Sequence, residues 1–183
     1  MKRSGVIILV LGFFFLSCSF DYREAQVPED LEDTIPNIVL TGFRQTVVSK
    51  GNVVLRIQVA KAEGFERKKR TIFQQVQFSE FDEEGKLITE GRADTVVYES
   101  ETKNATVSGK VLIHSLREEG KILAETLSWN DKERILTSPE GDRVRLEDEK
   151  GSWIEGTGFT ADLRRLLVTF SGPVRGEYVV EKK

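Results

Sequence analysis

Side chains that could perform catalysis are scarce in this sequence. His114 is its single histidine and Cys18 its single cysteine, so neither has a second imidazole or thiol with which to form a metal site or a nucleophilic pair. The carboxylates are numerous but gather in turn-like segments, where they are ordinary solvated groups. No phosphate loop, dinucleotide fingerprint or nucleophile elbow is present. The sequence therefore predicts a protein that is not an enzyme and needs no cofactor or metal, with His114 as a partly exposed structural residue.

Cys18 has the clearest chemical assignment. Lys2 and Arg3 precede an uncharged apolar run over residues 6–16, which is shorter than the about 20 residues of a membrane-spanning helix and is laid out like an export signal. Phe15-Leu16-Ser17-Cys18 resembles the lipobox of bacterial lipoproteins, in which the cysteine is acylated and becomes the mature N-terminus. The alternative is an uncleaved N-terminal helix that anchors the chain. Either anchor predicts that the rest of the chain lies outside the cytoplasm.

The overall charge argues against a nucleic-acid partner. The chain has 27 basic and 30 acidic residues, whereas phosphate binding needs a concentrated basic field. Basic residues cluster once, over residues 67–70. A run this short between two apolar stretches is typical of a solvated turn.

Three parts are predicted along the chain. Residues 1–18 form the lipoprotein-type signal or membrane anchor. Residues 19–37 form an acidic tether without strand or helix periodicity, within which Pro28 and Pro36 bracket the acidic residues. Residues 38–183 form one domain, which is long enough for a single core.

The domain reads as an all-β protein. Apolar and polar residues alternate in short runs that are rich in β-branched and aromatic side chains, which is typical of antiparallel strands. These runs lie over residues 53–59, 76–78, 105–113, 144–146 and 166–170.

A repeated turn organises these strands. Glycine-containing turns recur at Gly51, Gly85, Gly120 and Gly151, and each is followed by an apolar residue that opens a new strand. Charged breaks fall between them. The repeat predicts a rolled antiparallel sheet in which no single hairpin buries its own apolar face.

Two segments near the C-terminus have a less regular pattern. Residues 156–158 read Gly-Thr-Gly between apolar neighbours, which indicates a bulge or a close backbone approach. Residues 159–167 have helix-like apolar spacing, but the β-rich residues that follow make a bent strand or a single turn an equal alternative.

A rolled sheet would direct one set of apolar side chains inward. Those side chains either pack a closed core or line an apolar groove that is left open along one side. Such a roll also leaves free strand edges, to which another protein can add a strand. The predicted lining residues are Leu55, Ile57, Val59, Val76, Phe78, Val107, Val111, Ile113, Val144 and Leu146.

The order of several short motifs resembles the LptC family, the membrane-anchored periplasmic component of lipopolysaccharide export. Residues 93–98 resemble the family's Ala-Asp strand, and residues 107–113 its apolar strand around a central glycine. Residues 156–163 resemble its Gly-x-Gly stretch, and residues 174–178 its closing Val-Arg-x-x-Tyr. Cys18 is a departure, because the better-known members keep an uncleaved transmembrane helix.

The resemblance implies a β-jellyroll open along one side, on the periplasmic side of the inner membrane. Its groove would receive the acyl chains of lipopolysaccharide, or a similar glycolipid, from an inner-membrane ABC transporter permease. One sheet edge would dock that transporter. The C-terminal edge would pair with a soluble periplasmic protein of similar fold, through Val168, Phe170, Val174 and Tyr178.

Two hypotheses of function result. The first is a lipid-transfer component that bridges these two partners. The second is a structural or scaffolding lipoprotein of the same fold, whose interior is fully packed and which acts only through strand-edge contacts.

Overall fold

The computed structural model describes residues 34–180, and these residues form an all-β unit. Every strand pairing within them is antiparallel, and no helix is present among them, so the predicted fold class is confirmed. The predicted signal or anchor segment lies outside the described residues, as does most of the predicted tether. Within residues 34–180, no helix has the length and apolar character to cross a bilayer. The strands are β1 (Ile38–Ser49), β2 (Asn52–Phe65), β3 (Arg70–Phe81), β4 (Leu87–Glu99), β5 (Ala105–Ser115), β6 (Gly120–Asn130), β7 (Ile135–Thr137), β8 (Arg143–Asp148), β9 (Trp153–Thr157), β10 (Phe159–Asp162), β11 (Leu167–Phe170) and β12 (Val174–Glu177).

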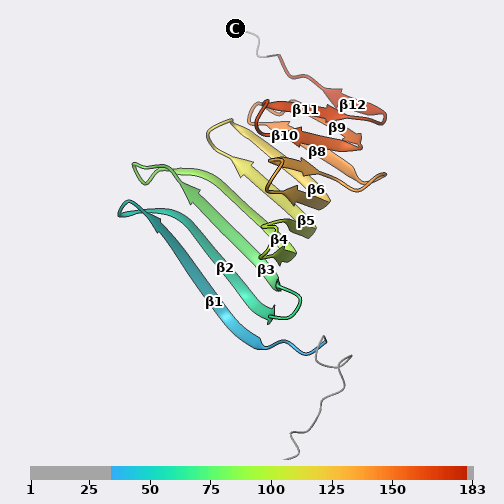
Figure 1. The fold of residues 1–183 in the computed structure, drawn as a ribbon. Helices are drawn as coiled ribbons and strands as arrows, with labels where there is room; N and C mark the ends of the chain where they lie inside the picture. The colour runs from blue at the N-terminus through green and yellow to red at the C-terminus, as the bar shows by residue number, and fades with distance from the viewer. Residues whose placement is uncertain (1–33, 181–183) are drawn as a thin grey trace, which may run out of the picture. The chain divides into compact units, whose positions relative to one another are not determined.

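The strands follow one another in chain order up to β6, where the sheet divides into two branches (Figure 1). The first half of β6 pairs with β8, which continues to β9 and then β12. The second half of β6 pairs with β7, which continues to β10 and then β11. The sheet is therefore open: β1, β11 and β12 each pair on one side only.

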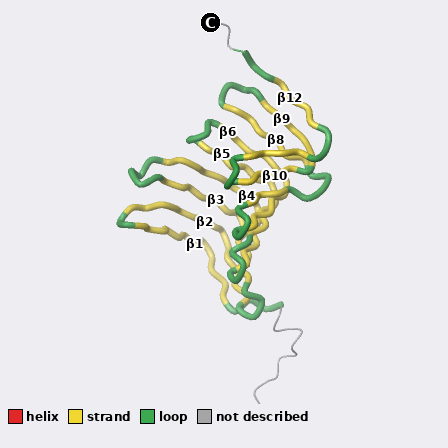
Figure 2. Tube along the Cα trace, turned by 45° about the horizontal axis from the view of Figure 1, so that its top comes forward, coloured by secondary structure: helices red, strands yellow, loops and turns green. Residues whose placement is uncertain are grey.

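A line of interrupted pairing crosses the six long strands near their midpoints. At each crossing, one or two residues have no partner in the ladder. From β1 to β4 the register is the same on both sides of the crossing, whereas from β4 to β6 it shifts, as in a β-bulge, which bends and twists a strand. Figure 2 shows β1 and β2 curving partway along their length. The unpaired residues are Gly42, Ala60, Gln75, Asp94, Gly109 with Lys110, and Glu125.

This line separates two walls. Wall 1 contains the strand halves that end at the glycine turns and is continued by β8, β9 and β12; wall 2 contains the other halves and is continued by β7, β10 and β11. The alternation changes at the unpaired residues, so that Val59 and Ala62, three positions apart, are buried in the same apolar cluster. Both walls can therefore present apolar side chains to the same interior.

Buried side chains concentrate beside the line of interrupted pairing. One cluster, near the end where the sheet divides, is built around Leu127, Val144 and Phe159, which are 0%, 0% and 1% exposed. A second, smaller cluster contains Val59, Ala62 and Val76. No charged or polar residue is buried within the described part of the chain. The core is therefore held by apolar contacts alone.

The predicted glycine turns are confirmed, with one difference. Asp82 and Asp148 build matching turns: the Oδ1 atom of Asp82 accepts hydrogen bonds from the backbone N–H of Glu84 and Lys86, and Asp148 does the same for Lys150 and Ser152. Their glycines have positive φ, 81° at Gly85 and 89° at Gly151, a conformation that favours glycine. In the turn between β5 and β6, however, Glu119 adopts the positive φ of 52°.

The Gly-Thr-Gly segment is a close approach, as predicted. A Cβ atom at Gly156 would lie 2.8 Å from Cδ1 of Phe170, and one at Gly158 would overlap Ser171. Gly158 has a φ of 64° and joins β9 of wall 1 to β10 of wall 2. Residues 159–167 are not helical: β10 and β11 pair as an antiparallel hairpin, with a turn at residues 163–166.

Candidate functional site

An apolar row crosses wall 1 at right angles to its strands. Residues directly opposite one another on neighbouring strands share a face of the sheet, and here seven consecutive pairings connect apolar residues or glycine. On β1 the paired residue is Gln45, so the row begins at β2. From β2 to β12 its members are Ile57, Phe78, Gly91, Ile113, Ile122, Leu146, Ile154 and Gly176.

The row remains partly open to solvent. Its aliphatic and aromatic members are partly exposed, and Ile154 is 39% exposed. The ring of Phe78 covers the position where Gly91 has no side chain, because a Cβ atom there would overlap the ring. Any larger residue at position 91 would push the Phe78 ring away, so glycine lets this ring fill the space on β4 between β3 and β5.

The predicted lining residues fall into three groups. Ile57, Phe78, Ile113 and Leu146 belong to the apolar row. Val59, Val76, Val111 and Val144 are 4%, 8%, 2% and 0% exposed and pack in the two buried clusters. Val107 packs against the larger cluster from wall 2, and Leu55 pairs with Glu80 near the outer end of wall 1. That these residues line a lipid groove stays a prediction.

Sequence reasoning missed four members of the row, one of which is Gly91. Ile122 and Ile154 were not expected to line the interior, and neither was Gly176. Ile122 follows the glycine turn that opens its strand, which is a usable signal. Ile154 and Gly176 lie in short strands whose faces depend on the register with β8 and cannot be read from alternation alone.

A hollow of about 570 Å³ lies at the end of the row, against β8, β9 and β12. Leu146, Ile154, Val174 and Tyr178 line it, together with Gly176, which contributes no side chain. Asp148 lies at its margin. Desolvation acts to raise the pKa of this carboxyl group, but hydrogen bonds from the side chain and backbone of Ser152 and from neighbouring turn amides hold the pKa below its usual value. The hollow therefore combines apolar side chains with charged groups, because Asp148 keeps its negative charge and Glu147, Arg175 and Glu177 also line the hollow.

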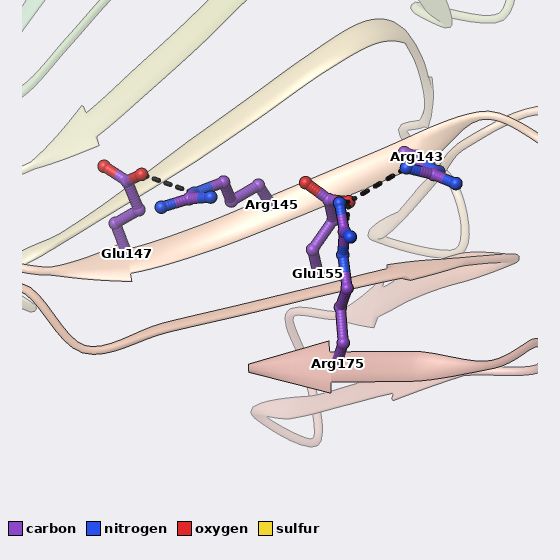
Figure 3. Close-up of polar contacts among 5 residues, drawn as sticks. All are labelled: Arg143, Arg145, Glu147, Glu155 and Arg175. Carbon is purple, nitrogen blue, oxygen red and sulfur yellow. Dashed lines mark hydrogen bonds and ion pairs between the residues drawn. The ribbon is translucent and has the colours of Figure 1, made fainter. Parts of the chain in front are cut away.

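Ion pairs join the same three strands on the opposite face (Figure 3). Glu155 follows Ile154, and successive side chains of a strand point to opposite faces. The Oε1 atom of Glu155 accepts hydrogen bonds from Nη2 of Arg175 at 2.8 Å and from Nη1 of Arg143 at 3.5 Å. The Glu155 side chain is only 15% exposed. One carboxylate on β9 thus connects to both β8 and β12.

Arg145 adds to this network. Its Nε atom donates a hydrogen bond to Glu147 at 2.5 Å, and its guanidinium lies 4.1 Å from the centre of the Trp153 ring. A cation over an indole is a favourable arrangement. The contact joins β8 to the start of β9.

The predicted docking residues lie on or beside two different edge strands. Val168 and Phe170 belong to β11, which pairs only with β10. Val174 belongs to β12, which pairs only with β9, and Tyr178 follows it. Val168, Val174 and Tyr178 are 46%, 47% and 81% exposed. Phe170 is partly buried and packs against Phe159, with ring centres 5.6 Å apart. A docking role for this edge stays a prediction.

His114 is placed among carboxylates. Its Nδ1 atom lies 3.3 Å from Oε1 of Glu90, and its Nε2 atom 3.6 Å from Oε1 of Glu149. Its side chain is 19% exposed. These contacts connect β4 and β5 to the turn after β8. Within residues 34–180, no group of histidine, cysteine and carboxylate side chains is arranged to hold a metal ion.

Comparison with known families decides the identity of this fold. Residues 5–179 match the family described as "Lipopolysaccharide-assembly, LptC-related". The chain belongs to the LptC family. The predicted membership is therefore confirmed. As a member, this LptC-family chain is a non-enzymatic component of lipopolysaccharide transport and outer-membrane biogenesis. It acts in the periplasm with other Lpt proteins.

A solved structure supports the fold of this LptC-family chain. It is similar to LptH from Pseudomonas aeruginosa, described as the LptA-homologous periplasmic component of the lipopolysaccharide transport device, with a TM-score of 0.50 and 16% sequence identity. The match covers 70% of this chain and 95% of LptH. The two proteins thus share the open β-jellyroll. No curated protein sequence matches the chain.

The Glu155 ion pairs give a first prediction for this LptC-family chain. Glu155→Gln removes the charge that Arg143 and Arg175 share, so we expect a loss of about 1–2 kcal/mol in the free energy of unfolding. Amide hydrogen exchange in β12 should also become faster. Urea denaturation and exchange mass spectrometry measure the two effects. The matched control is Glu125→Gln, an exposed glutamate on β6, and an equal loss in both variants would contradict the assignment.

Proposed function

We propose that this LptC-family protein receives lipopolysaccharide, or a related glycolipid, from an inner-membrane ABC transporter and passes it to a soluble periplasmic protein of similar fold. The observation that carries the proposal is the apolar row, which runs from β2 to the edge strand β12 and ends in the hollow lined by Leu146, Ile154 and Val174. Acyl chains lying against this row would leave water at one end of the sheet and emerge at the other.

The physical basis is the removal of apolar surface from water. Burial stabilises a lipid by roughly 25 cal/mol per Å² of apolar surface, or about 0.8 kcal/mol for each methylene group. A few buried methylene groups per chain therefore suffice to hold a lipid without any polar recognition. The protein's part is passive shielding, and ATP hydrolysis in the transporter drives the movement.

Lipid contact can be tested directly along the row. A photocrosslinking amino acid at Ile113 or Ile154 should capture glycolipid in cells, because both positions belong to the partly exposed row. The same amino acid at Glu125, an exposed position outside the row, should capture none. Crosslinked lipid is detected by immunoblotting of the purified protein. Absence of lipid from both row positions would leave the scaffolding lipoprotein as the better account.

The open edges supply the proposed partner contacts. β1 lies at one end of the strand order and β12 at the end of one branch, and both have unpaired edges that can accept a strand from another protein. We assign the transporter to the β1 edge. The soluble protein of similar fold is assigned to the C-terminal edge, where Val174 and Tyr178 are exposed.

Photocrosslinking also tests this assignment of edges. A crosslinker at Val174 should capture the soluble periplasmic protein, and one at Val48 on β1 should capture the transporter permease, since the side chains are 47% and 57% exposed. Mass spectrometry identifies the captured proteins. Each position serves as the control for the other. Capture of the two partners with their positions exchanged would refute the assignment.

The proposed anchor is the acylated Cys18, with an uncleaved N-terminal helix as the alternative. Mass spectrometry of the mature protein should find Cys18 as the N-terminal residue, with the mass of its acyl groups added. Membrane fractionation should then recover the protein with the inner membrane. Cys18→Ser should release it from the membrane if acylation is the anchor. A mature protein that still begins at Met1 would instead support the uncleaved helix.

A further inference from the structure

The turns at the two ends of the long strands differ in charge. Because the strands run antiparallel, successive turns alternate between the two sides of the sheet (Figure 2). Three of the four turns of wall 1 carry acidic pairs, at residues 83–84, 118–119 and 148–149, and the first turn, at residues 49–52, carries Lys50 instead. The first turn of wall 2, between β2 and β3, and the first residue of β3 carry four consecutive basic residues, at positions 67–70. We call residues 67–70 the basic turn.

The basic turn is exposed and has a fixed shape. Arg67, Lys68 and Lys69 are exposed, and Lys69 adopts a positive φ of 48°. The carbonyl oxygen of Lys69 accepts hydrogen bonds from the backbone N–H and the hydroxyl group of Ser100, at 2.8 and 2.9 Å. Within residues 34–180, neither Lys68 nor Lys69 forms an ion pair. The positive charges of Lys68 and Lys69 are therefore held in a defined place and have no ion-pair partner within this part of the chain.

The chain enters the domain beside this turn. The backbone N–H of Glu66 donates a hydrogen bond to Oδ1 of Asn37 at 2.8 Å, and the N–H of Asn37 donates to the carbonyl of Gly64 at 2.8 Å. Asn37 directly precedes β1, so the anchored N-terminal segment joins the domain at this corner. A fully extended chain from Cys18 to Asn37 spans at most roughly 65 Å, which limits how far this corner can lie from the surface that holds the anchor.

We propose that the basic turn rests on the anionic phospholipid headgroups of the membrane that holds the anchor. This proposal rests on the proposed anchoring at the N-terminus. Each basic residue close to an anionic leaflet increases the partitioning of a protein onto the membrane about fivefold. The acidic turns of wall 1 are repelled by the same surface, so the corner that carries the basic turn faces the membrane. The other end of the strand order, with β12, is then presented away from it.

The test places a fluorescent amino acid on each side of the sheet in the full chain. The labelled positions are Glu66, beside the basic turn, and Glu84, in an acidic turn of wall 1; both are exposed. The protein is reconstituted into phosphatidylcholine vesicles with or without phosphatidylglycerol, and a quencher is attached to the lipid headgroups. We expect stronger quenching at position 66 than at position 84, only with phosphatidylglycerol, and weakened by salt.

A matched pair of charge variants makes the test specific. Arg67→Gln with Lys68→Gln and Lys69→Gln should abolish the excess quenching at position 66, because three such charges contribute on the order of 100-fold in partitioning. Lys50→Gln with Lys86→Gln and Lys150→Gln removes the same amount of positive charge from the glycine turns of wall 1. This control variant should leave the excess quenching at position 66 unchanged. Equal quenching at both positions, or quenching that is insensitive to phosphatidylglycerol, would overturn the proposal.

One further outcome would show that acidic residues of this chain, and not lipid headgroups, neutralise the basic turn. Four acidic residues shortly precede the domain, and they could neutralise the basic turn themselves. In that case quenching would be absent in the natural chain and would appear once they are changed to glutamine, which would overturn the proposal. The four residues are Glu29, Asp30, Glu32 and Asp33.

Glycolipid capture at Ile154 distinguishes this proposal from the proposed function. If docking fails while capture persists, only the docking of the basic turn is wrong. If capture fails while the phosphatidylglycerol-dependent quenching persists, the lipid-carrier function is wrong and the docking stands.

Discussion

The aligned interruption of strand pairing is the constraint on which the rest of the structure depends. A regular strand sends alternate side chains to opposite faces. Across the interruption, however, Val59 and Ala62 on β2, and Phe73 and Val76 on β3, pack in the same cluster although they are three positions apart. Without this change of alternation, one half of each long strand would direct its apolar side chains to solvent. Because the unpaired residues line up from β1 to β6, the sheet acquires two walls that share one interior.

The division at β6 follows from the same constraint. Once the walls have separate directions, a short strand can continue only one of them, so β8 extends wall 1 while β7 extends wall 2. The chain returns from one wall to the other at Gly158, where any side chain would overlap Ser171. The branches end in the separate edge strands β11 and β12. On wall 1, the Glu155 ion pairs hold the last strands together from outside, which leaves their inner face apolar and open.

The sequence was sufficient for several of the strands, the glycine turns, the all-β class and the family, since these depend on local alternation and on the order of short motifs. It was not sufficient for the line of interrupted pairing. Gln75 and Lys110 take positive φ values of 52° and 49° there although neither is glycine. Alternation is therefore cut short at Gln75, and only residues 76–78 revealed β3. For the same reason the predicted lining set mixed buried residues such as Val144 with members of the open row such as Ile113. Glu155 and its two arginines meet only through the register of three short strands.

The apolar row also bears on how a lipid would move in the proposed function. From Ile57 to Leu146 its members are apolar or glycine and partly buried, so an acyl chain would gain a similar free energy at each position. Such a track has no preferred direction of its own. At its end, Ile154 is more exposed and Gly176 has no side chain, and the surface deepens into the hollow. More apolar surface is therefore within reach beside the β12 edge. A lipid would come to rest there, next to the strand to which we assign the receiving protein, while the transporter supplies the drive.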